Sequence, residues 1–334
     1  MTAPRFGFFF WPYEPALVER MVRLGEQHGW DLVGIADTPG NAMDLWVALA
    51  QAATLSTRVR LASCVTNLAT RDPAITAGAA ASLDRLSSGR FVLGVGAGHS
   101  GVVNVGRRPS PPSELREGLA RIRTLLDGDG VAPGRRVPVY AAASGPGALR
   151  AAGAAADGAF VNHGLGAGET ARARALLAEG AAQAGRAITA FDTWFVACLD
   201  VSERRETALS QLGNILGFVA AYVLGPAPAE RGVPAELVAA VAELRRQYTT
   251  RRREMDPDLV RRLGLFDYLR RRLAVAGTPD DCVEQARAAL AAGATNLMFT
   301  VSLAADPIRT VELFGRHVLP ALTATVVDSG RPQE

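Results

Sequence analysis

The stretch RFVLGVGAGHSGVVNVGRRPSPP, residues 90–112, decides which of two α/β folds the chain adopts. Its centre, GAGHSG from Gly96 to Gly101, spells G-x-G-x-x-G after an apolar run, as does the pyrophosphate loop of a dinucleotide-binding domain. That loop needs a helix directly behind it and an acidic residue about 20 positions later on the next strand. The prolines between positions 109 and 112 predict no helix before about Ser113, and the acidic residue is not found. The glycines therefore indicate another architecture.

Outward from this stretch, short β-rich runs alternate with longer helical patterns, which is the signature of parallel strands joined by crossover helices. We predict strands at 5–10, 32–36, 59–65, 91–95, 137–142, 159–162, 192–199 and 296–301. We predict helices at 15–28, 42–55, 74–86, 112–126, 147–154, 169–184, 203–224, 279–292 and 307–317. One continuous alternation of this length predicts a closed (β/α)8 TIM barrel that forms a single domain over residues 1–334.

Residues 225–278 interrupt the alternation before the last strand. The segment contains PAPAERGVPAEL, several arginines and LFDYLRRRLAVAG, and it predicts two more helices. A helical insertion within the barrel explains this segment without a second domain.

The composition is that of a globular protein, with 49% hydrophobic residues among 334 and a mean hydropathy of +0.11. No run approaches the about 18 apolar residues of a membrane span, and the first residues lack the order of a signal peptide. We therefore expect a cytoplasmic protein with no membrane partner. Cys64, Cys198 and Cys282 are widely spaced, so we expect reduced thiols, with neither a disulfide framework nor a metal site.

The basic residues are all arginine, 36 in number, and the formal net charge is +3. Arginine suits bidentate contacts to phosphate and carboxylate, so an anionic small molecule is a compatible ligand. The one dense run, Arg251 to Arg253, lies in a charge-mixed helical stretch without interleaved aromatic residues. We therefore expect no nucleic-acid partner.

In a TIM barrel the functional site lies at the carboxyl ends of the strands. The predicted strand ends are rich in polar residues and glycine: FFFWPYE, ADTPGN, SCVTNLATRDP, GVGAGHSG, AAASGPGA and VNHGLG. We expect these six segments to form one pocket for a small-molecule substrate.

Five features in this order resemble the bacterial luciferase-like superfamily, and within it the branch that uses the deazaflavin coenzyme F420. They are Asp37, CVTNLATRDP at 64–73, LDRLSSGRFVLGVGAG at 83–98, PVYAAASGPGALRAAGAAADG at 138–158, and AGTPDDCVEQARAALAAGATNLMF at 276–299 followed by Leu319-Pro320. The most similar members by motif are methylenetetrahydromethanopterin reductase-like and glucose-6-phosphate dehydrogenase-like enzymes.

The resemblance implies that the third strand ends in a bulge with a non-prolyl cis peptide bond that backs the deazaflavin ring. The cofactor-binding positions that it implies here are Ser63, Cys64, Val65, Thr66 and Asn67, with Gly96, Ala97 and Gly98 of the next strand end lying over the ring. Without the resemblance, an ordinary barrel strand end explains the same residues.

SGPGALR at 144–150 falls at a strand-to-helix turn. Backbone N–H groups at a helix start bind phosphate, and glycines let that backbone approach closely. The resemblance assigns Ser144, Gly145, Gly147 and Ala148 to the cofactor phosphate. A simple loop with proline in the first helical turn is the alternative.

Two residues are candidates for catalysis. An acid that supplies a proton stands at the place of His99 in sugar-phosphate dehydrogenase-like relatives, and histidine can do such work near neutral pH. Asp37 could bond the deazaflavin head or the substrate, or it could cap the helix near Ala42. Many relatives have Asp-His where this chain has Asp37-Thr38, so sugar-phosphate oxidation is in doubt.

His163, at the sixth strand end, could line the pocket.

The resemblance implies an oxidoreductase that transfers a hydride between C5 of F420 and a C=N or C=C bond of a small organic substrate. One alternative is a monooxygenase of the same superfamily that uses reduced FMN and oxygen. Another is a non-catalytic member that binds a flavin-like ligand. Luciferase-like barrels commonly pair through their early helices, so alanine-rich helices such as TAGAAASLDRL at 76–86 predict a homodimer.

Overall fold

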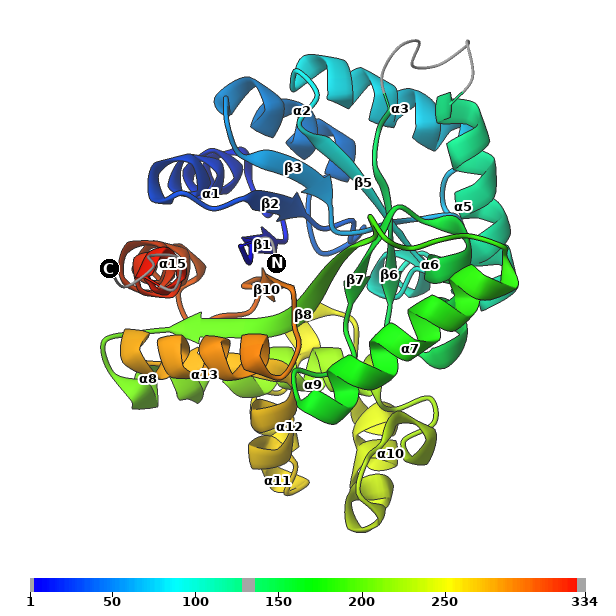
Figure 1. Ribbon diagram of the computed structural model, residues 1–334. Coiled ribbons are helices and arrows are strands. Elements are labelled where there is room, and N and C mark those ends of the chain that lie inside the picture. The colour runs from blue at the N-terminus through cyan, green and yellow to red at the C-terminus, as the bar shows by residue number, and fades with distance from the viewer. Residues whose placement is uncertain (1–2, 128–135, 329–334) are drawn as a thin grey trace, which may run out of the picture.

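The computed structural model describes residues 3–127 and 136–328. Its parallel strands follow the order β10-β1-β2-β3-β5-β6-β7-β8, and pairing of β10 with β8 closes the ring (Figure 1). The strands are β1 Phe6–Phe10, β2 Leu32–Ile35, β3 Arg60–Ser63, β4 Thr66–Asn67, β5 Phe91–Gly96, β6 Val139–Ala143, β7 Gly158–Val161, β8 Asp192–Val201, β9 Ala274–Gly277 and β10 Asn296–Thr300. The predicted TIM barrel is confirmed.

Helices surround the strands, as each crossover connection requires (Figure 1). Along the crossovers lie α1 Pro15–His28, α2 Leu45–Leu55, α3 Pro73–Leu86, α4 Ser100–Val103, α5 Pro112–Asp127, α6 Pro146–Ala155, α7 Ala167–Gln183, α8 Arg205–Ser210, α9 Leu212–Val223, α13 Pro279–Ala291, α14 Pro307–Leu313 and α15 Leu319–Asp328. The helix predicted at 203–224 is thus divided in two at Gln211, and the helix predicted at 307–317 leads through a π-helical turn into α15.

The segment 225–278 was predicted to hold two helices, and it holds more than that. It contains α10 Val238–Gln247, α11 Leu259–Arg262 and α12 Phe266–Leu273, and it ends in strand β9. These helices lie outside the ring that surrounds the barrel (Figure 1). They share a hydrophobic core with α9 that includes Leu216, Val241 and Leu269, so the segment is held against the barrel rather than free of it.

The helix α4 corrects the prediction that no helix begins before about Ser113. It starts at Ser100, directly behind the glycine loop, and its Val102 is fully buried. The prolines at 109–112 constrain only their own neighbourhood, and Gly98 supplies the positive φ, +83°, that turns the chain into the helix. One helical turn inside a closed barrel is still no dinucleotide-binding domain.

The strands divide the core into two parts because successive side chains point to opposite faces of a strand. On β8, Phe195 and Ala197 pack outward against the helices, whereas Trp194 and Val196 point into the barrel. The barrel interior is filled by Leu32, Ala62, Cys64, Val92, Tyr140, Phe160, Trp194, Val196 and Met298. This packed interior separates the two ends of the barrel.

Candidate active site

A pocket of about 420 Å³ opens at the carboxyl ends of the strands, within the size range of small-molecule sites. Its apolar floor is the upper layer of the barrel interior: Phe9, Cys64, Val65, Phe160, Val196 and Met298. Its walls come from the strand-end segments, with Asp37, Thr38, Asn67, Gly96, Ala97, Gly98, His99, Ser144, Ala148 and Asn162. Phe218, Tyr222, Pro226 and Arg245 close one side. The strand ends therefore meet in one pocket, as expected.

The third strand ends as the resemblance implied. The peptide bond between Cys64 and Val65 is cis, and both residues line the floor. Ser63 beneath them is buried and exchanges hydrogen bonds with Gly94 of β5, whose missing side chain lets the two strands approach. Burial raises the pKa of the Cys64 thiol well above its usual range, so this side chain is a neutral packing group.

Asp37 lies two residues beyond the end of β2 and is half-buried at the pocket wall. Its Oδ2 accepts a hydrogen bond of 2.8 Å from the hydroxyl of Thr66. Burial raises the pKa of the Asp37 carboxyl, the nearby Asp44 carboxylate raises it further, and the Thr66 hydrogen bond opposes both. The capping role considered for Asp37 is wrong, because Asp44 is the N-cap of α2 and accepts from the backbone N–H groups behind it. The Asp37 carboxyl is therefore available to a ligand.

His99 follows the glycine loop and lies among aromatic rings. Its ring centre is 4.5 Å from that of Tyr222, 5.7 Å from that of Phe218 and 5.8 Å from that of Tyr248. Burial, and then the positive charge of Arg245, lower the pKa of His99 to about 4, so its ring is neutral at pH 7. Its Nδ1 is buried and has no hydrogen-bond partner in the described part of the chain.

The turn before α6 carries a guanidinium that the sequence did not suggest. Gly145 is the N-cap of α6, and Ser144 and Ala148 line the pocket beside it. A Cβ at Gly145 would collide with the guanidinium of Arg231, so that side chain lies directly against the helix start. The site thus combines backbone N–H donors with a positive side chain, the chemistry that recognises a phosphate.

Gly147 of this turn and His163, which follows β7, do not line the pocket. Gly147 makes room for Pro112, whose Cγ would be 2.7 Å from an added Cβ, so packing accounts for this glycine. His163 is buried and does not line the pocket, and its Nδ1 lies 2.9 Å from the carbonyl oxygen of Ser144. Its neighbour Asn162 takes the lining position because the strand alternates its side chains.

Cofactor, metal and membrane features can be read from the same described residues. Within residues 3–127 and 136–328, no group of three or more His, Cys, Asp or Glu side chains could hold a metal ion. The cysteines at 64, 198 and 282 are buried free thiols. No helix in this part of the chain is long and apolar enough to cross a membrane.

A family model and several named proteins match this chain in sequence. The model of the family described as luciferase-like monooxygenase matches residues 12–296. The chain is 27% identical to 5,10-methylenetetrahydromethanopterin reductase of Methanolobus tindarius, over 94% of this chain and 99% of the relative. It is 30% identical to F420-dependent glucose-6-phosphate dehydrogenase of Rhodococcus erythropolis, over 92% of this chain and 94% of the relative.

Solved structures show the same fold. The F420-dependent tetrahydromethanopterin reductase of Methanopyrus kandleri superposes with a TM-score of 0.77 at 24% identity, covering 96% of this chain and all of the other. An F420-dependent secondary alcohol dehydrogenase in complex with an F420-acetone adduct has a TM-score of 0.74 at 19% identity, covering 96% of this chain and 99% of the other.

Proposed function

This chain belongs to the luciferase-like monooxygenase family, and from that premise we propose that it is an oxidoreductase that uses coenzyme F420. The proposed reaction transfers a hydride between C5 of the deazaflavin and a C=N or C=C bond of a small organic substrate. Relatives of nearly full length are named as F420-dependent enzymes, both reductase and dehydrogenase. The observation that carries the proposal is an apolar pocket floor beside a glycine turn against which the guanidinium of Arg231 lies.

The residues present fit the coenzyme. Val65, Phe160 and Met298 offer an apolar floor on which a planar ring can stack. Gly96 and Gly98 line the pocket beside this floor and pack closely against their neighbours, because an added Cβ would meet Val65 at Gly96 and Val102 at Gly98. Gly145 and Arg231 provide donors for the phosphate of the coenzyme side chain. The ring and the phosphate of the coenzyme would thus contact different strand ends around one pocket.

When bound, the coenzyme supplies or accepts the hydride, and the protein supplies orientation, a dry pocket and a proton. We propose that Asp37 handles this proton. Its carboxyl lines the pocket, and its raised pKa keeps it protonated to a higher pH than an exposed aspartic acid. Thr66 orients the carboxyl through its hydroxyl. Thr38 stands where many relatives have histidine, so we propose no sugar-phosphate substrate.

A monooxygenase that uses FMN is the second candidate, because the family includes such enzymes. A type II Baeyer-Villiger monooxygenase in complex with FMN superposes with a TM-score of 0.62, lower than the two F420-dependent structures. The chemistry differs as well, since the deazaflavin has carbon at the position where a flavin nitrogen supports oxygen activation.

Anaerobic titration separates these candidates. The protein is mixed with reduced F420 and, separately, with reduced FMN, and its melting temperature is measured. A ligand at 100 times its dissociation constant stabilises the folded state by about 2.7 kcal/mol. We expect this stabilisation with F420. We also expect the protein with reduced F420 to reduce at least one compound in a panel of imines and enones. Stabilisation by FMN with consumption of oxygen on aeration would reject the proposal, and tight F420 binding without turnover would indicate the non-catalytic alternative.

His99→Phe is expected to change turnover by less than about tenfold. The ring of His99 is neutral at pH 7 and packs against Tyr222, and phenylalanine keeps this packing. A general acid would be worth roughly 10²–10⁴-fold instead. The measurement is kcat between pH 6 and 9 for wild type and His99→Phe. His99→Ala is the comparison: it loses the ring packing, so we expect it to weaken coenzyme affinity. A shifted basic limb of the rate profile in His99→Phe would show that His99 is the proton donor.

We propose a homodimer that forms through α2 and α3. Ile75 of α3 and Val47 of α2 are each 61% exposed, and a dimer interface would remove this apolar surface from water. Ile75→Glu should therefore turn a dimer into a monomer in light scattering at micromolar concentration. Val105→Glu, at an exposed apolar residue behind α4, is the control and should remain dimeric. A monomeric parent protein would reject the proposal.

A further inference from the structure

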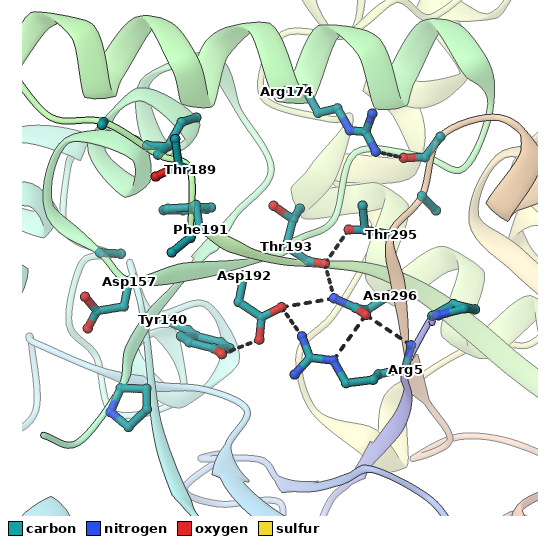
Figure 2. A pocket seen from close by; sticks show the side chains of 18 of the residues that line it. Arg5, Tyr140, Asp157, Arg174, Thr189, Phe191, Asp192, Thr193, Thr295 and Asn296 are labelled. Carbon is teal, nitrogen blue, oxygen red and sulfur yellow. Dashed lines mark hydrogen bonds and ion pairs between the residues drawn. The ribbon is translucent and has the colours of Figure 1, made fainter. Parts of the chain in front are cut away.

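A second and larger cavity, of about 1150 Å³, lies at the opposite end of the barrel (Figure 2). Its lining comes from the beginnings of the strands, with Arg5 before β1, Arg60 on β3, Tyr140 on β6 and Asp192 on β8. The packed barrel interior lies between this cavity and the proposed active site. The amino ends of the strands carry no part of the reaction proposed above, so the cavity is a separate feature.

The cavity has an excess of positive charge. Its described lining includes the arginines Arg5, Arg60, Arg136, Arg174 and Arg186. Only two carboxylates, Asp157 and Asp192, belong to the described lining. If these arginines served only to form ion pairs at the end of the barrel, they would need no excess over the carboxylates. A concave surface with one sign of charge concentrates ligands of the opposite sign.

Both carboxylates are already occupied by protein donors. Asp192 accepts from Arg5, from the hydroxyl of Tyr140 and from Nδ2 of Asn296 at 3.0 Å (Figure 2). It also accepts from Nε1 of Trp194 at 3.1 Å. Asp157 accepts from Nη1 of Arg123 at 2.8 Å and from Nη2 of Arg136 at 2.7 Å.

Arg60 and Arg174 are two of the lining arginines that have guanidinium N–H donors to spare. The guanidinium of Arg60 forms an ion pair with Asp192 at 3.9 Å, a distance too long for a hydrogen bond, and its side chain is 29% exposed. Arg174 reaches the cavity from α7, on the side opposite Arg5, and gives one hydrogen bond to the carbonyl of Gly293 (Figure 2). Guanidinium groups thus face the cavity from two sides, the arrangement that holds an oxyanion between them.

The rest of the lining indicates that the ligand is more than an ion. Tyr140, Phe191, Ile188 and Leu290 provide apolar surface, and Thr189, Thr193 and Thr295 provide hydroxyl groups. The volume exceeds what a phosphate ion fills. We propose that this cavity binds an organic phosphate, with the phosphate groups between Arg60 and Arg174 and the organic body against the apolar wall.

The experiment is calorimetric titration with ATP in magnesium-free buffer at low salt, with tripolyphosphate and adenosine as the two halves of the probe. We expect one ATP per chain, weaker binding of tripolyphosphate and none of adenosine. Arg60→Gln and Arg174→Gln should each weaken ATP binding about tenfold or more, the worth of charge-assisted hydrogen bonds. Added salt should weaken it too. Arg23→Gln, at an exposed arginine of α1, is the matched control and should change nothing.

Further variants show where ATP binds and whether each protein is folded. Gly145→Val should leave ATP binding unchanged, because it alters only the phosphate turn of the proposed active site. If Gly145→Val abolishes the binding, the phosphate lies at that turn and this proposal is overturned. Unchanged affinity in both arginine variants, or no ATP binding at all, also overturns it. Melting temperatures without ligand confirm folding, and Arg174 lies outside the Asp192 hydrogen-bond network, so its variant tests the site if Arg60→Gln is unstable.

Discussion

Asp37→Asn should lower the turnover of substrate reduction by roughly 10²–10⁴-fold, the usual worth of a positioned acid or base. The amide keeps the shape of the carboxyl and can still accept the hydrogen bond of Thr66, so coenzyme affinity should change little. Single-turnover oxidation of bound reduced coenzyme measures the chemical step directly. Asp31→Asn is the control, because burial also raises the pKa of Asp31. Its carboxylate lies outside the pocket and accepts a hydrogen bond from the backbone N–H of Phe6, at the amino end of β1.

The pH dependence follows from the same raised pKa of Asp37. If the protonated carboxyl donates to substrate, the rate of reduction should fall as pH rises through the folded-state pKa, and Asp37→Asn should remove this limb. A rate profile that Asp37→Asn leaves unchanged would show that Asp37 is no proton donor.

Asp37→Asn should raise stability at pH 7 although it lowers turnover. A carboxyl whose pKa is higher in the folded state binds more protons there than in the unfolded chain, so the free energy of unfolding falls as pH rises from the unfolded pKa through the folded one. The ionised Asp37 therefore costs stability at pH 7. Asp37→Asn should raise the melting temperature at pH 7. It should not do so at pH 3, where the Asp37 carboxyl is protonated in both the folded and the unfolded wild-type chain. An inactive variant that is also less stable at pH 7 would point to misfolding instead.

The fold was predictable from local signals wherever these are strong. Helix α1 begins at Pro15 and ends at His28 as predicted, because proline fits the first helical turn and Gly29, with φ of +78°, ends the helix. Helix α2 begins three residues later than predicted, since Asp44 rather than an earlier residue caps it. Strand β9 was missed because AVAG at the end of a helical segment carries no alternation that distinguishes a strand.

The site was predictable only where strand ends carry it. Asp37, the Cys64–Val65 cis bond and the glycine loop follow from position along the barrel and from resemblance. Tyr222 and Arg231 come from the connection between β8 and β10, where no strand end marks a lining residue. Their place depends on how that connection folds back over the barrel, and a sequence pattern does not contain this information. The cavity at the amino ends was missed for the same reason, since its arginines are far apart in sequence and belong to no motif.

The Gly145→Val substitution should weaken F420 affinity by roughly 10²-fold, the worth of one or two charge-assisted hydrogen bonds. Gly145 has φ of −108° and ψ of 163°, a conformation that valine readily adopts, so the backbone need not change. The new Cβ would meet the guanidinium of Arg231, whose Nη1 donates to the carbonyl of Val223 at 3.0 Å. Arg231 must then move away from the helix start, and the added methyl groups keep a phosphate from the backbone N–H donors.

Two kinds of control test this prediction. Gly168→Val alters the first turn of the neighbouring helix α7, where an added Cβ meets nothing within 4 Å, and it should leave affinity and stability unchanged. A deazaflavin that lacks the phosphate side chain should bind to wild type and Gly145→Val equally, because the proposed ring site, the apolar floor at Val65, does not include the turn at Gly145. Arg231→Met should weaken F420 but not this fragment. Equal loss of both ligands in a folded Gly145→Val protein would mean that the turn shapes the ring slot, and the phosphate assignment would be wrong.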